Sequence, residues 1–369
     1  MKFTVLKDNF LKGLNIVGKA INARAPVPIL SNILIKTEKG RLVLMASGLQ
    51  ITISAKIGAK VDKEGEITIP AKLLIDFVSQ IADEKIEASL DGSVLTLKTD
   101  KSSAKFSGAG ADEFPAIETI KKGVSFDLSS KEFAKAMQYA GFTVASDEGR
   151  PVLTGLYIEA EKSGILFAGT DGFRMAEYKM KLAKSIEEKV SFIVPARSFI
   201  EVGRALLAES ESVSLTVDSE KNLLVLKVDD FEAYFRMIDG EYPDYRSIIP
   251  SDFTTEVHVS RADFENGVKL SNIFSRDSGN MIKLIVGKKG IQSMSQPSES
   301  GSNTTNISAE VTGEDVEIAF NAKYLLEFFA SISDDEIVFK ISDSLKPGLF
   351  KLEGKDHYFY IVMPMKANW

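Results

Sequence analysis

Three stretches of sequence decide the fold: ITIPAKLLIDFVSQI at residues 67–81, FIVPARSFIEVGRAL at residues 192–206 and IAFNAKYLLEFFASI at residues 318–332. Each begins with a short strand-like run that reaches Pro70, Pro195 or Asn321, and then continues with apolar residues at helical spacing. Pro70 and Pro195 are 125 residues apart, and Pro195 and Asn321 are 126 apart. A strand followed by an amphipathic helix therefore recurs three times at one period.

A second strand and helix open each repeat. The openings are KFTVLKDNFLKGLNIVGKAI at 2–21, SFDLSSKEFAKAMQYAGFTV at 125–144 and EVHVSRADFENGVKLSNIFS at 256–275. One apolar stripe at 3.6-residue spacing marks the first two helices, formed by Phe10, Leu14, Val17 and Ile21 and then by Phe133, Met137, Ala140 and Val144. The third copy breaks the stripe with Ser271 and Ser275, and its Ser260 with Asp263 resembles a capping box.

Each copy ends with paired strands and a turn, and the sequences DEFP at 112–115 and GEYP at 240–243 punctuate the first two copies. These signals predict three domains, at residues 1–122, 123–250 and 251–369. Three strand-rich domains with two helices each indicate an α+β fold, with the helices on one side of antiparallel sheets.

Composition narrows the class of protein. With 369 residues, 44% of them hydrophobic and 26% charged, the chain is expected to be globular and to form two or three domains. It contains no cysteine, which excludes disulfides and thiolate metal sites. The opening residues alternate between apolar and polar, unlike a signal peptide, and no apolar run approaches membrane-spanning length. These features favour a protein located in a reducing cytoplasm.

Motifs for catalysis are absent from the sequence: it contains no GxSxG, Walker A, HExxH or GxGxxG motif. Its only histidines, His258 and His357, are interpreted as ordinary strand or surface residues. Asp171 and Gly172, in GTDGFRM, are interpreted as a hairpin turn rather than as an acid site. We therefore expect a binding or scaffolding protein without a catalytic residue, metal or cofactor.

Charge alone argues against broad nucleic-acid binding, because the net charge is −7 and the isoelectric point is about 5.3. The distribution of charge can still differ from the total. Lys72, Arg197 and Lys323 occupy the same first-turn position in the three repeated helices. One such residue would be interpreted as a solvated surface residue, but three matching positions favour a basic helical face. Other basic residues also fall on or beside the helices: Arg24, Arg150, Arg204, Lys269 and Arg276.

Several segments together resemble one family. MKFTV, NARAPVPILSNILI, ITIPAKLL, GTDGFRMA, IVPARS, GEYPDYRSIIP and IVMPM are similar to segments of the bacterial DNA polymerase III beta subunit, the DNA sliding clamp. The resemblance covers essentially the whole chain, in order. It implies a noncatalytic processivity factor for DNA replication: a head-to-tail homodimer ring with helices lining a central hole and sheets outside, which encircles double-stranded DNA and tethers the polymerase.

Helix counting agrees with a dimer. Twelve helices packed at about 8 to 10 Å would form a circle roughly 32 to 38 Å across at their axes. Subtracting one helix diameter of about 10 Å leaves roughly 22 to 28 Å, which admits a duplex about 20 Å wide. Six helices would enclose too little space, so one chain is expected to form half a ring.

The resemblance also implies site residues. Arg24, Lys72, Arg150 and Arg197 match lining or DNA-contacting positions, and Lys323 is added from the repeat alone. An apolar groove is expected to accept short peptides from DNA polymerase III subunits, the clamp loader, other polymerases and repair proteins. Its matched positions are Leu153, Thr170, Gly172, Arg174, Met175, Pro243, Ile248, Val362, Met363, Pro364 and Met365. Phe106, Ile273 and Phe274 match apolar positions of the dimer interface.

Two departures from the family pattern stand near this groove. Phe173 replaces a frequent histidine, and the sequence continues after MPM as KANW. Trp369 is expected to belong to a free tail rather than to fold over the groove. Two alternatives remain at this stage: a repeat scaffold that binds proteins but not DNA, and an enzyme that uses Asp171.

Overall fold

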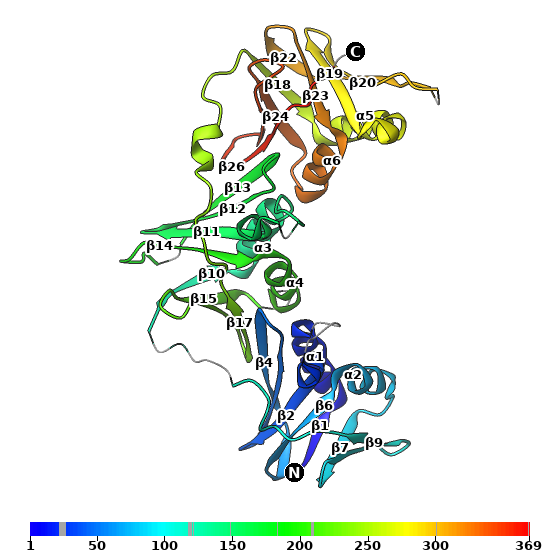
Figure 1. Cartoon of the computed structure of the whole chain (residues 1–369), viewed down its shortest axis with the longest axis vertical. Coiled ribbons are helices and arrows are strands. Elements are labelled where there is room, and N and C mark those ends of the chain that lie inside the picture. Colours follow the sequence, from blue (N-terminus) through cyan, green and yellow to red (C-terminus); the bar gives the residue numbers. More distant parts are fainter. Residues whose placement is uncertain are drawn as a thin grey trace. The chain divides into compact units, whose positions relative to one another are not determined.

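The computed structural model describes residues 1–21, 27–116, 120, 122–147, 149–182, 184–207, 210–299, 301–367 and 369. The chain divides into two compact units. The first comprises Met1–Ala134 and Arg197–Ile238, and the second comprises Lys135–Ala196 and Asp239–Trp369 (Figure 1). Arg24, one of the expected DNA-binding residues, lies outside the described residues.

The first unit contains two antiparallel sheets. The five-stranded sheet has the order β5 (Lys60–Lys63), β1 (Lys2–Leu6), β7 (Lys85–Asp91), β8 (Val94–Lys98) and β9 (Ser103–Ser107). The eight-stranded sheet has the order β10 (Val124–Ser129), β15 (Ser212–Asp218), β16 (Leu223–Val228), β17 (Phe231–Arg236), β4 (Ile51–Gly58), β3 (Arg41–Ser47), β2 (Asn32–Glu38) and β6 (Gly65–Pro70). The helices of the first unit are α1 (Lys7–Val17), α2 (Ala71–Gln80), η1 (Gly18–Ala20) and η2 (Pro28–Ser31). In sequence, α3 (Ser130–Gly141) and α4 (Ala196–Leu207) each contain a point at which the chain passes from one unit to the other.

The second unit also contains two antiparallel sheets. The nine-stranded sheet has the order β14 (Val190–Pro195), β11 (Gly155–Glu161), β12 (Gly164–Thr170), β13 (Arg174–Lys181), β26 (Lys355–Val362), β25 (Gly348–Leu352), β24 (Glu336–Ile341), β18 (Thr255–Ser260) and β22 (Glu310–Gly313). The four-stranded sheet has the order β21 (Thr304–Ile307), β20 (Gly290–Ser295), β19 (Met281–Gly287) and β23 (Val316–Asn321). Its helices are α5 (Arg261–Ser275), α6 (Ala322–Ser331), η3 (Pro151–Thr154), η4 (Tyr245–Ile248) and η5 (Arg276–Ser278).

Strands from different repeats join the two largest sheets. In the first unit, β17 of the middle repeat pairs with β4 of the first repeat, with Ala233 opposite Ile53. In the second unit, β13 of the middle repeat pairs with β26 of the third, with Ala176 opposite Tyr360. The middle repeat therefore contributes strands to both units.

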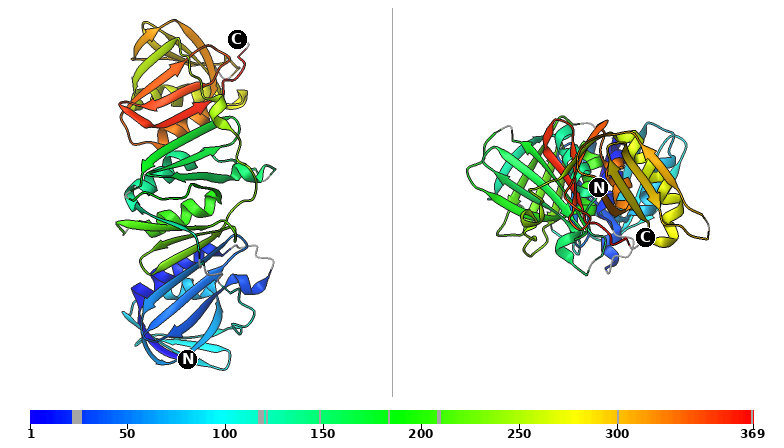
Figure 2. Two further views of the ribbon diagram at one scale, coloured as in Figure 1. Left: turned by 90° about the vertical axis from the view of Figure 1, so that its left-hand side faces the viewer. Right: turned by 90° about the horizontal axis from the view of Figure 1, so that it is seen from above.

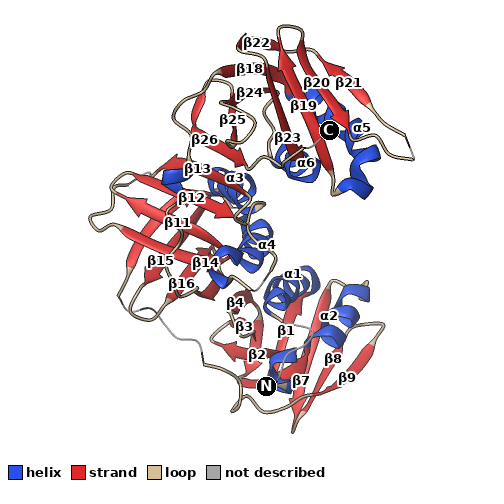
Figure 3. Cartoon of the chain, turned by 45° about the horizontal axis from the view of Figure 1, so that its top comes forward, coloured by secondary structure: helices blue, strands red, loops and turns tan. Residues whose placement is uncertain are grey.

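The repeated helices form where the sequence predicts them, but the first two end before the last residue of the predicted stripe, so that Ile21 and Val144 lie outside α1 and α3 and are half-buried. In α1, Phe10, Leu14 and Val17 are fully buried, and α2 buries Leu74 and Val78. Such burial stabilises a folded chain by about 1.5 to 3 kcal/mol for each large apolar side chain. Figure 3 shows α1 beside α2 and α5 beside α6, each pair against the strands of its own unit. The predicted α+β class with antiparallel sheets is confirmed.

The third copy keeps its stripe but makes it partly polar. Ser271 and Ser275 on α5 are fully buried. The Ser271 hydroxyl lies 2.8 Å from the Ser293 hydroxyl and donates to Asn303 Oδ1 at 3.0 Å. These bonds satisfy a polar group that would otherwise destabilise the core. Ile273 lies off the stripe and is 54% exposed.

Helix capping differs from the prediction in this copy. The side chain of Ser260 makes no capping hydrogen bond at the start of α5, so the predicted capping box is wrong. The first turn is instead bridged by Arg261, whose Nη1 lies 3.1 Å from Glu265 Oε2. Asn321 does cap α6, because its Oδ1 accepts the backbone N–H of Lys323 at 3.0 Å. In the described part of the chain, no helix is both long and apolar enough to cross a membrane.

His258 on β18 lies between two carboxylates. Its Nδ1 is 2.8 Å from Glu353 Oε2, and its Nε2 is 3.0 Å from Glu256 Oε1. Partial burial opposes a charge on the ring, but the hydrogen bonds and charges of Glu353 and Glu256 outweigh it and raise the pKa of His258 above its usual value. Lys340, which is paired with Glu256, and the cross-strand Glu310 also lie beside it, and Glu336 lines the same surface pocket.

Because the folded-state pKa of His258 is raised, its contribution to stability is complete below about pH 6.5 and is lost as the pH rises through the folded-state value. We expect the melting temperature to fall between about pH 6 and pH 8, and to fall less in His258→Gln. Differential scanning calorimetry across this range measures the difference. Equal slopes for the two proteins would show that the imidazole is not charged in the fold.

Candidate nucleic-acid interface and partner groove

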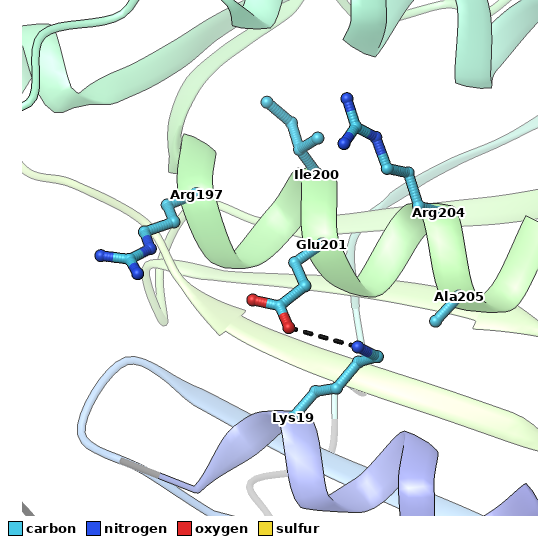
Figure 4. A pocket seen from close by; sticks show the side chains of 6 residues that line it. All are labelled: Lys19, Arg197, Ile200, Glu201, Arg204 and Ala205. Atoms are coloured by element: carbon cyan, nitrogen blue, oxygen red, sulfur yellow. Dashed lines mark hydrogen bonds and ion pairs between the residues drawn. The ribbon is translucent and has the colours of Figure 1, made fainter. Parts of the chain in front are cut away.

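A basic hollow lies in the first unit between η1 and α4. Its volume is about 600 Å³, and its lining consists of Lys19, Arg197, Ile200, Glu201, Arg204 and Ala205. Lys19 Nζ is 3.2 Å from Glu201 Oε1, and Figure 4 shows Glu201 directed toward Lys19 while Arg204 extends away from it. One carboxylate therefore neutralises one of the three cations here.

The two arginines of α4 stand on the face opposite its core residues. Phe199 and Val202 are fully buried on this helix, whereas Arg197 is exposed. Among the described residues, neither Arg197 nor Arg204 is paired with a carboxylate. Two guanidinium groups that lie on the same face of a helix and have no carboxylate partner suit contact with phosphate oxygens.

The matching helix positions are also exposed. Lys72 on α2 is 90% exposed at its side chain, and its Nζ lies 2.7 Å from Asp76 Oδ2. The hydrogen bond and charge of Asp76 raise the pKa of Lys72. Lys323 on α6 is exposed. Arg150 is exposed too, and its Nη2 donates to the Asp171 carbonyl at 3.1 Å. Lys72 and Arg197 belong to the first unit, and Arg150 and Lys323 to the second.

In the second unit, Asp171 organises the turn that joins β12 to β13. Its Oδ1 accepts the backbone N–H groups of Phe173 at 2.8 Å and Arg174 at 3.0 Å. Gly172 has a positive φ of 92°, which favours glycine. The predicted hairpin turn is confirmed, and its carboxylate is committed to this turn and to Arg174.

Arg174 is the buried cation of this region, with only 8% of its surface exposed. Its Nε donates to Asp171 Oδ2 at 3.0 Å, and its Nη1 lies 2.6 Å from Glu327 Oε2 on α6. The guanidinium also lies over the ring of Tyr324, 4.5 Å from its centroid. Arg174 thus ties the turn to α6.

The expected groove residues fall into two connected groups. In the first, Arg174 pairs with Val362 across β13 and β26, and the Met363 N–H donates to the Phe173 carbonyl at 2.8 Å. Thr170 Oγ1 donates to the Arg174 carbonyl at 2.7 Å and accepts the Gly172 N–H at 3.0 Å. Leu153, buried in η3, is joined to this group because its N–H donates to the carbonyl of Arg150, which itself bonds the turn.

The second group surrounds the segment that follows Asp239. Met175 points to the opposite face of β13 from Arg174 and packs with Leu166, Ala168 and Tyr245. Tyr245 donates to Glu177 Oε2 at 2.5 Å, and its N–H bonds the Pro243 carbonyl. Burial and the Glu177 carboxylate both raise the pKa of Tyr245. Pro243 and Ile248 are exposed beside this anchor.

Two exposed apolar residues lie side by side in the first group. Phe173 is 58% exposed and Met363 is 38% exposed, and their backbones are bonded to each other. Pro364 and Met365 are half-buried and continue the same segment. An exposed apolar surface of this kind, beside a buried cation, suits a short peptide ligand with apolar side chains.

The expected interface residues differ in exposure. Phe106 on β9 is buried, and its ring meets Phe77 edge to face with centroids 5.5 Å apart. Ile273 is exposed and Phe274 is half-buried on α5. Phe106 belongs to the first unit and the other two to the second.

Trp369 departs from the prediction. Its ring lies over Lys283 on β19, with the Lys283 Nζ 4.8 Å from the ring centroid. The expectation of a free tail is therefore wrong, because the residue is held on the four-stranded sheet of the second unit.

Sequence reasoning missed Lys19, Glu327 and Tyr324, which complete the hollow and hold Arg174. Their partners are distant in sequence, so no local pattern marks them. Only the basic character of Lys19, between Val17 and Ile21 of the first apolar stripe, could have drawn attention to it. Among the described residues, no group of three or more His, Cys, Asp or Glu side chains is placed to hold a metal ion.

Replacing Arg174 by methionine would leave the carboxylates of Asp171 and Glu327 without their buried partner. We expect a loss of roughly 2 to 4 kcal/mol in the free energy of unfolding, reduced from the fully buried case because Glu327 is half exposed. Lys323→Met on the same helix as Glu327 is the surface control, with a change within about 0.5 kcal/mol. Denaturant unfolding measures both, and equal stabilities would contradict a structural role for the Arg174 pairs.

Comparisons with known proteins cover nearly the whole chain. The family models of the DNA polymerase III beta subunit match at residues 1–118 for the N-terminal domain, 127–244 for the central domain and 246–366 for the C-terminal domain. The beta sliding clamps of Staphylococcus epidermidis and Staphylococcus aureus are 26% identical over 378 residues, covering 100% of both chains.

Solved structures agree with these relatives. The DNA polymerase III beta subunit of Thermotoga maritima matches with a TM-score of 0.93 and 25% identity, covering 99% of each chain. The sliding clamp of Bacillus subtilis matches with a TM-score of 0.95 and 24% identity, covering 100% of this chain and 99% of that one. The chain therefore belongs to the DNA polymerase III beta subunit family, the bacterial DNA sliding clamps, which are processivity factors and not enzymes.

Proposed function

We propose that two copies of this chain close head to tail into a ring around duplex DNA and tether the replicative polymerase through a peptide groove on the second unit. The proposal extends the family assignment to the residues that close the ring, face the DNA and bind partners. It includes domain boundaries near residues 122 and 250 and a cytoplasmic location.

The topology of the sheets is the observation that supports ring closure most strongly. In the repeat, β9, β17 and β26 are equivalent last strands, and β4, β13 and β21 occupy equivalent positions at the end of their own half-sheets. β17 pairs with β4 and β26 pairs with β13, whereas within the described residues β9 and β21 each pair on one side only. The repeat thus predicts that β9 of one copy pairs with β21 of another.

Such a pairing would join the five-stranded and four-stranded sheets into one of nine strands, the size of the largest sheet within the chain. It would also remove two exposed sheet edges, which otherwise invite aggregation. Because the two edges are different surfaces, the contact is heterologous, and two copies close it into a ring by symmetry. Phe106 on β9 and the exposed Ile273 of α5 supply apolar side chains near these edges.

The basic residues suit weak, sequence-independent contact with DNA. Arg197 and Arg204 are free of carboxylates among the described residues, while Lys72 and Lys19 are partly neutralised by Asp76 and Glu201. Arg150 and Lys323 add exposed cations in the second unit, and Arg24 is included from the family resemblance. Since phosphate contacts strengthen with each free cation, partial neutralisation keeps the attraction low enough for a topologically linked ring to slide.

The groove is proposed as the surface for partners. DNA polymerase III subunits, the clamp loader and other polymerases and repair proteins would place apolar side chains against Leu153, Phe173 and Met363. A structure of the Pseudomonas aeruginosa clamp, bound to griselimycin, shows that a relative with the same fold accepts a ligand. A non-DNA-binding repeat scaffold is the competing function, and it would need neither a basic hollow nor a closed ring.

A retention experiment separates the two functions. We expect the chain, once loaded by its clamp loader, to remain on nicked circular duplex DNA during gel filtration and to be lost after the circle is cut once, because the link is topological. Binding that survives linearisation would indicate ordinary DNA affinity. Failure to remain on either DNA would favour the scaffold.

The interface has its own test. Ile273→Ala combined with Phe274→Ala removes the apolar side chains offered to β9 of the second copy, so we expect sedimentation to show monomers at concentrations where the parent chain is dimeric. Leu270→Ala, which removes another partly exposed apolar residue of α5, is the matched control. A dimer that withstands the double substitution would refute the assigned contact.

A further inference from the structure

The segment that carries Met363 bridges the two sheets of the second unit. On one side, the Met363 N–H donates to the Phe173 carbonyl at 2.8 Å, next to β13 of the nine-stranded sheet. On the other side, the Met365 N–H donates to the Ala319 carbonyl at 2.7 Å, on β23 of the four-stranded sheet. Met363 and Met365, which are two residues apart, therefore fix the same segment to both sheets.

Residues 366, 367 and 369 lie at the outer face of the four-stranded sheet. Ala319 is opposite Lys283 in the β19–β23 pair, and Lys283 stands between Ile282 and Leu284, which are fully buried toward the core. Ala319 consequently faces outward, yet it is only 3% exposed. Residues 365–367 line a cleft of about 550 Å³ together with Lys283 and Ala319, which accounts for this burial.

Trp369 anchors the far end of this segment. Its ring lies over the Lys283 ammonium at 4.8 Å, and Lys283 also donates to the Trp369 carbonyl. The Lys283 side chain is only 16% exposed, and its Nζ is 3.5 Å from Glu317 Oε2. A cation that is shielded from water attracts an aromatic face more strongly than a fully hydrated surface lysine, and the ion pair with Glu317 limits where the Lys283 ammonium can move. In Figure 2 the end of the chain, marked C, lies beside the strands of the second unit.

We propose that Trp369 is a positioning residue for the partner groove: its contact with Lys283 holds residues 363–365 in the conformation that accepts a peptide. This inference rests on the proposed groove, but the contact between Trp369 and Lys283 lies outside it. Without the anchor, the segment after Met363 would lose its hold on β23, and a partner would have to order it on binding. That ordering weakens affinity without removing any contact in the groove.

Fluorescence tests the anchor without any partner, because Trp369 is the only tryptophan of the chain. We expect Lys283→Ala to raise the acrylamide quenching constant about two- to threefold, since the ring leaves a shielded site. Lys289→Ala, which removes an exposed lysine from the turn between β19 and β20, is the matched control and should leave quenching unchanged. Lys283→Arg keeps the cation and should restore protection. Equal quenching in all four proteins would overturn the anchor.

Affinity for the polymerase subunit of the same organism tests the positioning. We expect Trp369→Ala to raise the Kd about three- to tenfold while the melting temperature stays unchanged, and Trp369→Phe to recover most of the affinity through its aromatic face. Hydrogen exchange of a peptide covering residues 361–367 should quicken in Trp369→Ala, because the Met365 N–H loses its restraint. An unchanged Kd with quickened exchange would overturn the positioning role.

Met363→Ala separates this inference from the function beneath it. If Met363→Ala weakens polymerase binding and Trp369→Ala does not, the groove stands and the positioning role of Trp369 is refuted. If neither substitution changes the Kd, the groove itself is refuted. If both weaken it and only Trp369→Ala is rescued by an aromatic residue, both proposals hold.

Discussion

Pairing between strands of different repeats is the interaction on which the rest of this structure depends. A repeat of this size contains two half-sheets, and each half-sheet ends in a strand with unused backbone donors and acceptors. β17 with β4 and β13 with β26 satisfy those edges inside the chain. The same rule leaves β9 and β21 to be satisfied by a second copy, so ring closure follows from the way the repeats are already joined.

This arrangement separates the roles of the two faces of each repeat. The sheets carry the joints, and the helices bury one stripe against them while their first turns expose Lys72, Arg197 and Lys323. An acidic chain can then present a modestly basic helical surface, with Asp76 and Glu201 limiting its strength. Partner recognition uses a third region, where the end of β13, the end of β26 and the segment around Tyr245 meet within one unit.

Much of this organisation could be predicted from the sequence, because it is carried by local patterns. The strand and helix of each repeat follow from residues such as Pro70 and from stripes such as Phe10, Leu14 and Val17. The break in the apolar stripe at Ser271 was visible in the sequence, but the hydroxyl network that keeps Ser271 buried was not. The hairpin at Asp171 could also be predicted from the sequence, since its turn residues are contiguous.

Contacts between residues far apart in sequence could not be predicted. Ser260 has the composition of a cap, yet its hydroxyl makes no capping bond, because composition does not determine where a side chain points. The pairing of Arg174 with Glu327 and the contact of Trp369 with Lys283 arise only when the sheets of the second unit come together. The assignment of the DNA-facing and interface residues still rests on the repeat and on the family resemblance.

The central claim is that the unused sheet edges of two copies join to enclose DNA. Single-particle images of the purified chain loaded on nicked circular duplex test it most directly. We expect closed rings of two copies with duplex DNA through the hole and continuous sheets where β9 meets β21 of the partner copy. Single copies lying against the side of the duplex, or rings closed through other surfaces, would contradict it.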